Sequence, residues 1–180
     1  MVTSDARIKK IISGAWDDLG IVNALNPVRF RHSDALRYPG EDGEGHERIG
    51  FIAQNVARVL PVATASQTGV VPDIQQVCAF SGSNITFYGS NINAGDVLNL
   101  VNADGNIFGF NVHVTEVSAS NITIDNYENL TGSNVFVYGH EVNDFLTVNY
   151  EPITACTVGA IQRLSQLVEA LTARVTALEA

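Results

Sequence analysis

The hydrophobic positions at the start of the chain repeat with the period of an α-helix. Between residues 5 and 19 the apolar side chains are three, one, three, one and three residues apart, so they share one helix face. They are Ile8, Ile11, Ile12, Ala15, Trp16 and Leu19. Ser4 or Asp5 is a suitable N-cap and Gly20 a suitable end, so the pattern predicts a helix over residues 5–19.

After this helix the pattern changes to alternation of apolar and polar residues, which indicates strands. Residues 28–32 alternate in this way, and residues 49–52 form a second short apolar run. The acidic, glycine-rich stretch 33–47 between them is typical of a surface loop. Residues 53–60 then predict a helix, because Pro61 is a natural place for one to stop.

From about Val70 onward, short β-type runs alternate with turn signals. An Asp-Gly step at 104–105 lies between two of the runs and is typical of a hairpin. The runs cover residues 96–101, 107–117, 121–125 and 134–139. Together they predict a small antiparallel sheet or barrel inserted between the two ends of the chain.

The clearest periodic signal lies near the C-terminus. Apolar residues there are three, four, three, four and three apart, which gives a heptad seam with β-branched residues at a and leucine at d. The seam residues are Ile161, Leu164, Val168, Leu171, Val175 and Leu178. We expect this seam to pack either on copies of the chain or on the chain's own core. Its a and d residue types favour dimers, whereas Leu167 at a g position widens the face enough for a third strand.

These elements predict an α+β fold. It has an N-terminal helix and short strands, an inserted small antiparallel β-sheet or barrel, and a long C-terminal helix that forms an oligomeric bundle. We expect the N-terminal part to cover residues 1–78, the β-rich insert residues 79–147, and the oligomerisation helix residues 148–180.

Composition narrows the possible partners. The 180 residues carry a net charge of −9, which argues against a nucleic-acid-binding module, and no apolar run is long enough to predict a membrane partner. The cysteines, Cys78 and Cys156, are too few for a disulfide scaffold, so we expect two buried small hydrophobes. The four histidines lack the spacing of metal ligands, and no cofactor or metal is expected.

One possible reactive pair lies near the N-terminus. The chain has only two lysines, Lys9 and Lys10, and Ser4 lies five residues before the first. A serine hydroxyl becomes a nucleophile when a neutral amine removes its proton, which requires burial of the lysine. Residues five apart lie about 140° apart on a continuous helix, so Ser4 would have to sit off the helix end or use a base from elsewhere, including another subunit. The alternative is a capping serine followed by a solvated lysine pair.

Three separated segments resemble one known family. They are SDARIKKII at 4–12, NPVRFRH followed by IGFIAQNVARVLP at 49–61, and VNYEPITACTVGAIQRLSQLVEAL at 148–171. In this order they are similar to the C-terminal self-cleaving intramolecular chaperone domain of phage tailspikes, endosialidases and neck appendages, which also occurs in myelin regulatory factor. The insert, ending in VFVYGHEVNDFLTVNYEPI, is similar to a longer version found in large DNA viruses of algae and amoebae.

The resemblance implies a function and a set of site residues. Domains of this family trimerise behind a fibrous passenger, assist its folding and then cut themselves off before a motif serine. On this chain Ser4 would be the nucleophile, Lys9 its base, and Thr3–Ser4 the scissile bond. Asp5 and Arg7 match the motif and would orient the loop or stabilise the oxyanion. The motif glutamine corresponds to Gln54.

The resemblance also implies the partners and the location. The expected assembly is a homotrimer. Only three residues precede Ser4, so we expect either that the passenger lies outside this sequence or that the cleavage position is not used in this chain. The protein would be virion-associated, or present in the host cytoplasm during virus assembly. The alternative from a different class is a non-catalytic trimerisation and attachment module of a virion protein, with a receptor- or glycan-binding β insert.

Overall fold

The computed structural model describes residues 6–10, 17–34, 36–40, 46–89, 91–102 and 110–180. The chain divides into two compact units. The helical unit comprises residues 1–27, 51–64 and 148–180, and the strand unit comprises residues 28–50 and 65–147. Each unit has its own hydrophobic core, so each is described by itself.

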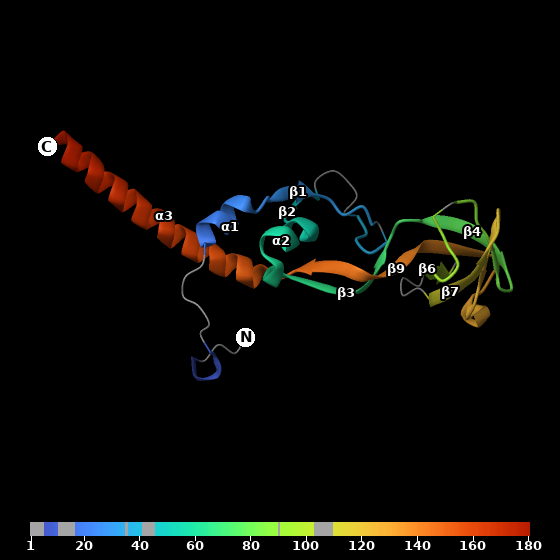
Figure 1. Ribbon diagram of the computed structural model, residues 1–180. Helices are drawn as coiled ribbons and strands as arrows, with labels where there is room; N and C mark the ends of the chain where they lie inside the picture. Colours follow the sequence, from blue (N-terminus) through green and yellow to red (C-terminus); the bar gives the residue numbers. More distant parts are fainter. Residues whose placement is uncertain (1–5, 11–16, 35, 41–45, 90, 103–109) are drawn as a thin grey trace. The chain divides into compact units, whose positions relative to one another are not determined.

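The helical unit is organised around one long C-terminal helix (Figure 1). Its elements are the 3-10 turn η1 (Ala6–Ile8), α1 (Asp18–Ala24), α2 (Ala53–Val59), the 3-10 turn η2 (Pro61–Ala63) and α3 (Tyr150–Glu179). Apolar side chains of α1, α2, η2 and α3 meet in a core whose buried members are Val56, Leu60, Ala63, Ile153 and Cys156. The helix over residues 53–60 is therefore confirmed. None of the helices in the described ranges is long and apolar enough to cross a membrane.

The helix predicted over residues 5–19 is wrong where the structure describes it. Only a 3-10 turn is present at Ala6–Ile8, residues 9 and 10 are not helical, and residues 11–16 lie outside the described residues. Helix α1 instead begins at Asp18 and continues through Gly20, the expected stop. The reason is local: the Asp17 carboxylate accepts a hydrogen bond from the Gly20 N–H at 3.1 Å, and a Cβ on Gly20 would lie 2.2 Å from that carboxylate. Here glycine permits the cap that starts the helix.

Antiparallel strands make up the other unit. A hairpin is formed by β1 (Val28–Phe30) and β2 (Arg48–Gly50). The larger sheet contains β3 (Thr64–Val71), β4 (Gln76–Ser81), β5 (Asn84–Thr86), β6 (Val97–Asn102), β7 (Phe110–Val117), β8 (Asn121–Ile124) and β9 (Asn134–Val148), with η3 (Tyr127–Asn129) before the last strand. Their order is β3-β9-β4-β5-β8-β7-β6, and a further pairing of β9 with β6 closes six of them into a ring. The α+β class with an inserted antiparallel sheet or barrel is confirmed.

Side chains at alternate positions of the strands fill the interior of this ring. The buried set includes Cys78, Ile85, Leu98, Leu100, Val112, Val114, Ile122, Ile124, Val135 and Val137. The four predicted runs correspond to β6, β7, β8 and the first part of β9, while residues 103–109 of the expected hairpin turn lie outside the described residues. The strands β3, β4 and β5 were not predicted. In β3 this is understandable, because the middle of the strand is exposed and carries no apolar alternation.

The last strand changes partners part-way along its length. Its first half pairs with β4 and β6, and its second half runs beside β3 (Figure 1). At the change, a Cβ on Gly139 would lie 1.8 Å from the Val71 carbonyl oxygen, so only glycine fits this backbone approach. The register of β6 against β9 also shifts here, between Asn99 and Leu100. This crossing fixes the position of His140, the next residue.

A buried polar pair ties the loop after β1 to the same strand. The Tyr138 hydroxyl donates a hydrogen bond to the Asp34 carboxylate, and both residues are buried. Asp34 also accepts from the Arg37 backbone N–H at 3.1 Å and pairs with the Arg37 guanidinium at 3.8 Å. Burial, and then the hydrogen bond to Asp34, raises the pKa of Tyr138 to about 12.

Loss of this hydrogen bond should therefore change how the free energy of unfolding depends on pH in the alkaline range. A tyrosine whose pKa is raised by folding contributes stability that is complete below its ordinary value of 10 and is lost as the pH rises to about 12. We expect Tyr138→Phe to cost about 1–3 kcal/mol at neutral pH and to flatten the alkaline loss between these values. Urea unfolding of both proteins across this range measures the effect. Tyr88→Phe, an exposed tyrosine of the same unit, is the matched control, and an equal effect there would contradict the assignment.

Candidate functional site

The N-terminal site residues fall partly within the described ranges. Thr3, Ser4 and Asp5 lie outside the described residues, whereas Arg7 and Lys9 lie inside them and are exposed. Lys9 follows the end of the 3-10 turn and is not helical. The separation of about 140° between residues five apart holds only on a continuous helix, so it does not apply to Lys9. Helix geometry is therefore no argument against a pairing of Lys9 with a residue five positions earlier.

The motif glutamine lies in a different segment of the helical unit. Gln54 is in the first turn of α2, with an exposed side chain, while Val56 on the same helix is fully buried in the core. Gln54 and Lys9 are thus both solvent-accessible in the single chain. A lysine acts as a base only after burial has displaced its proton, so a single chain does not provide the environment that this chemistry needs.

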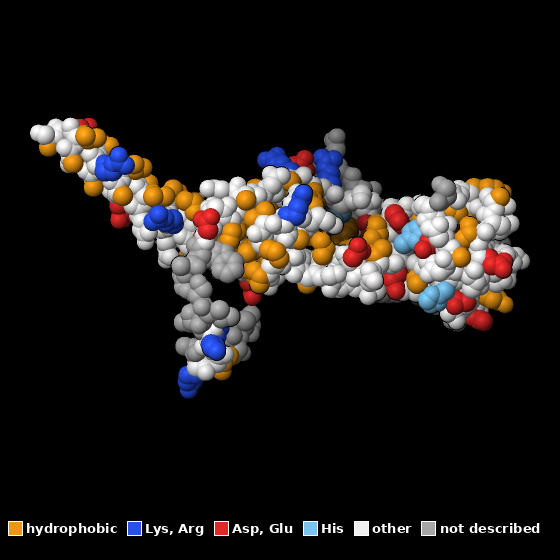
Figure 2. Space-filling view, viewed as in Figure 1, with side chains coloured by type: hydrophobic (Ala, Val, Ile, Leu, Met, Phe, Trp, Pro, Cys, Tyr) orange, Lys and Arg blue, Asp and Glu red, His pale blue; other side chains and the backbone are white. Residues whose placement is uncertain are grey.

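The heptad residues of α3 form an exposed apolar row. Their side chains are between 51% and 85% exposed, and Leu167 beside them is 37% exposed. Figure 2 shows this row as a line of orange atoms along the part of α3 that extends beyond the other helices. No described residue of the chain covers it. The seam therefore does not pack on the described core of its own chain, which was one of the two partners expected for it.

Helix α3 divides its surface between two roles. Its N-terminal half buries Ile153, Cys156 and Ala160 against α1 and α2, and α1 approaches so closely that a Cβ on Gly159 would lie 2.1 Å from the Asp18 carboxylate. The other side of this half carries Tyr150, Val158 and Ile161, which are all at least 50% exposed. The row of exposed apolar side chains thus begins beside the chain's own core and continues to the end of the helix.

The two thiols are structural. Cys78 lies in the interior of the barrel and Cys156 in the helical core, and neither is in a disulfide. Burial raises the pKa of both thiols, and the nearby Asp18 carboxylate adds to the effect on Cys156. The prediction of two buried small hydrophobes is confirmed.

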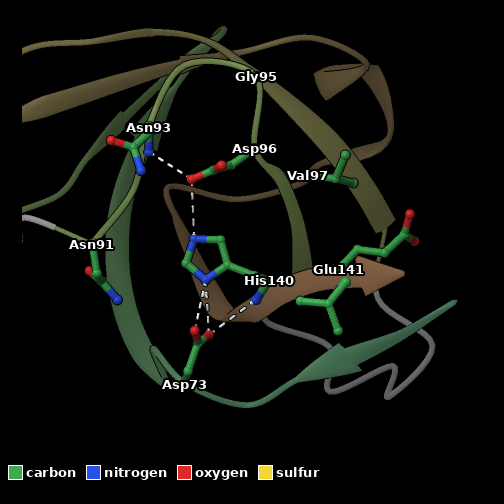
Figure 3. A pocket seen from close by; sticks show the side chains of 9 residues that line it. Asp73, Asn91, Asn93, Gly95, Asp96, Val97, His140 and Glu141 are labelled. Atoms are coloured by element: carbon green, nitrogen blue, oxygen red, sulfur yellow. Dashed lines mark hydrogen bonds and ion pairs between the residues drawn. The ribbon is translucent and has the colours of Figure 1, made fainter. Parts of the chain in front are cut away.

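A second constellation lies in the strand unit and was not predicted from the sequence. A hollow of about 450 Å³ is lined by polar side chains around His140 (Figure 3). The lining residues are Asp73, Asn91, Asn93, Gly95, Asp96, Val97, His140, Glu141 and Val142. They come from β9, from the first residue of β6 and from the segments before β4 and β6, so no local spacing in the sequence indicates them. Within the described ranges no group of three or more His, Cys, Asp or Glu side chains is arranged to hold a metal ion.

Comparison with known proteins identifies a family for the first part of the chain. Residues 4–64 match the model of the family described as chaperone of endosialidase, a family of self-cleaving intramolecular chaperones. The chain is also 25% identical, over 235 aligned residues, to the uncharacterized protein VP1 of Micromonas pusilla reovirus (isolate Netherlands/2005). The alignment covers 99% of this chain and 12% of that viral protein, so the chain spans about an eighth of its length. The resemblance inferred from the sequence motifs is confirmed.

Proposed function

We propose that the chain trimerises, assists the folding and assembly of an upstream fibre or spike passenger, and then releases itself by cutting the Thr3–Ser4 bond. The match of residues 4–64 to a family of self-cleaving intramolecular chaperones carries this proposal, because the matched segment contains both Ser4 and Lys9. The viral relative supports a role in a virion protein or during virus assembly.

The exposed row on α3 supports self-association. Soluble proteins rarely leave a continuous apolar surface of this kind uncovered, and a heptad seam is complementary to a copy of itself. Charge adds an orientation. In parallel helices a g residue lies beside the e residue five positions later on its neighbour. Of the three such pairs along the seam only the last is charged, and it consists of Arg174 and Glu179. A parallel, in-register bundle therefore pairs opposite charges at the C-terminal end of the seam.

The proposed cut uses two side chains and water. The Ser4 hydroxyl attacks the Thr3 carbonyl carbon while the neutral Lys9 amine takes its proton. The C–N bond then breaks, the proton passes to the Ser4 nitrogen, and the Thr3 acyl group is left as an ester on the Ser4 oxygen. Water hydrolyses this ester and frees the passenger with a new C-terminal Thr3. Arg7 and Asp5 would orient this loop or stabilise the oxyanion, and Gln54 is the corresponding motif residue of α2.

Assembly and cutting are coupled in this mechanism. Lys9 is exposed in the single chain, and so is not buried as the proposed chemistry requires. When neighbouring chains cover this segment, burial favours the neutral amine that can act as a base. The cut would then occur only after the trimer has formed. A passenger would be released once its three copies are together.

A fusion experiment tests the proposal. A passenger domain that is monomeric on its own is joined upstream of Thr3, and the product is followed by mass spectrometry and by light scattering. We expect two fragments, with a new N-terminus at Ser4, and a trimeric C-terminal fragment. A fusion that stays intact while trimeric would contradict self-cleavage and would favour the attachment module.

A further inference from the structure

His140 lies between two carboxylates, one at each ring nitrogen. Its Nδ1 lies 2.9 Å and 3.0 Å from the two carboxylate oxygens of Asp73, and its Nε2 lies 3.4 Å from Asp96 Oδ2 (Figure 3). The backbone N–H of His140 donates to Asp73 as well, at 3.1 Å. The imidazole side chain is only 14% exposed. The ring is thus a bridge between two segments that are far apart in the sequence.

The number of N–H groups on the ring distinguishes how the neutral imidazole and the imidazolium fit between the two carboxylates. A neutral imidazole has one N–H, so one of its nitrogens would turn a lone pair toward a carboxylate oxygen. The imidazolium has an N–H on both nitrogens and can donate toward both carboxylates. Glu141 on the same strand adds a further negative charge to the lining, and no described lysine or arginine lines the hollow. The other charged side chains that line the hollow in the described ranges are therefore all acidic.

The two contacts of the ring are unequal. Asp73 is held twice, by the ring and by the backbone N–H of His140, so this side keeps a hydrogen bond whatever the charge of the ring. The Asp96 carboxylate is the more distant partner, and it also accepts from the Asn93 backbone N–H at 2.7 Å. When the ring loses its proton, the contact with Asp96 is the one that is lost.

We propose that His140 forms a proton-dependent bridge across the hollow: the imidazolium links Asp73 to Asp96, and deprotonation breaks the contact between the ring and the Asp96 carboxylate, while backbone hydrogen bonds to β7 keep the preceding turn in place. Histidine is the side chain that ordinarily changes charge between about pH 5 and pH 8, so this bridge is sensitive to protons. The inference concerns the strand unit alone. It does not depend on the proposed self-cleavage.

Nuclear magnetic resonance of the labelled full chain tests the bridge between about pH 5 and pH 8.5. We expect both ring nitrogens of His140 to be protonated at the acidic end. We also expect the amide signals of Asn93, Gly95 and Asp96 to shift together with the loss of its proton. In Asp96→Asn the carboxylate is absent but an oxygen remains for the Asn93 N–H, so the joint shift should disappear while the fold persists.

Two further variants separate the bridge from general effects of pH. His140→Gln should leave these three amide signals unchanged across the same range. His113→Gln, which removes an exposed histidine of β7, should leave the wild-type shift in place. The proposal is overturned if His140 is neutral throughout, if it titrates without moving the amides at 93–96, or if the amides move equally in His140→Gln.

Discussion

Ser4→Ala should leave a passenger fusion at full length while the protein remains a trimer. The variant lacks the oxygen that attacks Thr3 and forms the ester, so the proposed transfer of the Thr3 acyl group cannot occur. We expect the rate of cleavage to fall by at least about a thousandfold, which removes the second fragment from a gel. Light scattering on the uncut fusion reports whether assembly is retained.

The two adjacent lysines allow a matched test of which one acts as the base. Lys9→Ala should block cleavage as Ser4→Ala does, because the proton acceptor is gone. Lys10→Ala removes the same charge one residue away and should cut like the wild type. Full cleavage in Ser4→Ala would exclude the serine from the mechanism. Equal losses in the two lysine variants would indicate a general effect of charge rather than a specific base.

Patterns that reflect one continuous apolar face were predicted well. The heptad repeat of α3 and the alternation in β6, β7 and β8 arise because each element has a single apolar side, and this side is visible in the sequence. The N-terminal helix was predicted by the same rule and is wrong. Its apolar spacing continued past residue 16, but the Asp17 cap, a local hydrogen bond, determines where α1 begins.

Contacts between distant segments could not be predicted from the sequence. Asp34 and Tyr138 are 104 residues apart, and Asp73 and His140 are 67 apart, so neither pair produces a periodic or spacing signal. Both depend on the change of partners along β9, which in turn requires glycine at 139. A glycine within a run of β-type residues is a weak indication of a bulge, and it does not identify the strand that approaches it.

The seam on α3 should determine both assembly and cleavage. Leu171→Asp places a charge at a d position in every copy, where burial without a partner costs several kcal/mol per chain. We expect the variant fusion to be monomeric at concentrations where the wild type is trimeric, and to remain uncut because Lys9 stays exposed. Gln166→Asp adds the same charge on the same helix at an f position, away from the seam, and should neither dissociate nor stop cleaving.

The two readouts of the seam variant distinguish the parts of the proposal. A monomeric Leu171→Asp fusion that still cuts would show that the reactive pair forms within one chain, and the coupling of cleavage to assembly would be lost. A trimeric Leu171→Asp fusion would mean that the exposed row does not form the interface. If cleavage returns in mixtures of Leu171→Asp with excess wild type, the wild-type copies supply the burial that the variant cannot provide alone. Such rescue follows from a base that becomes neutral only between chains, and a site complete within one chain would not produce it.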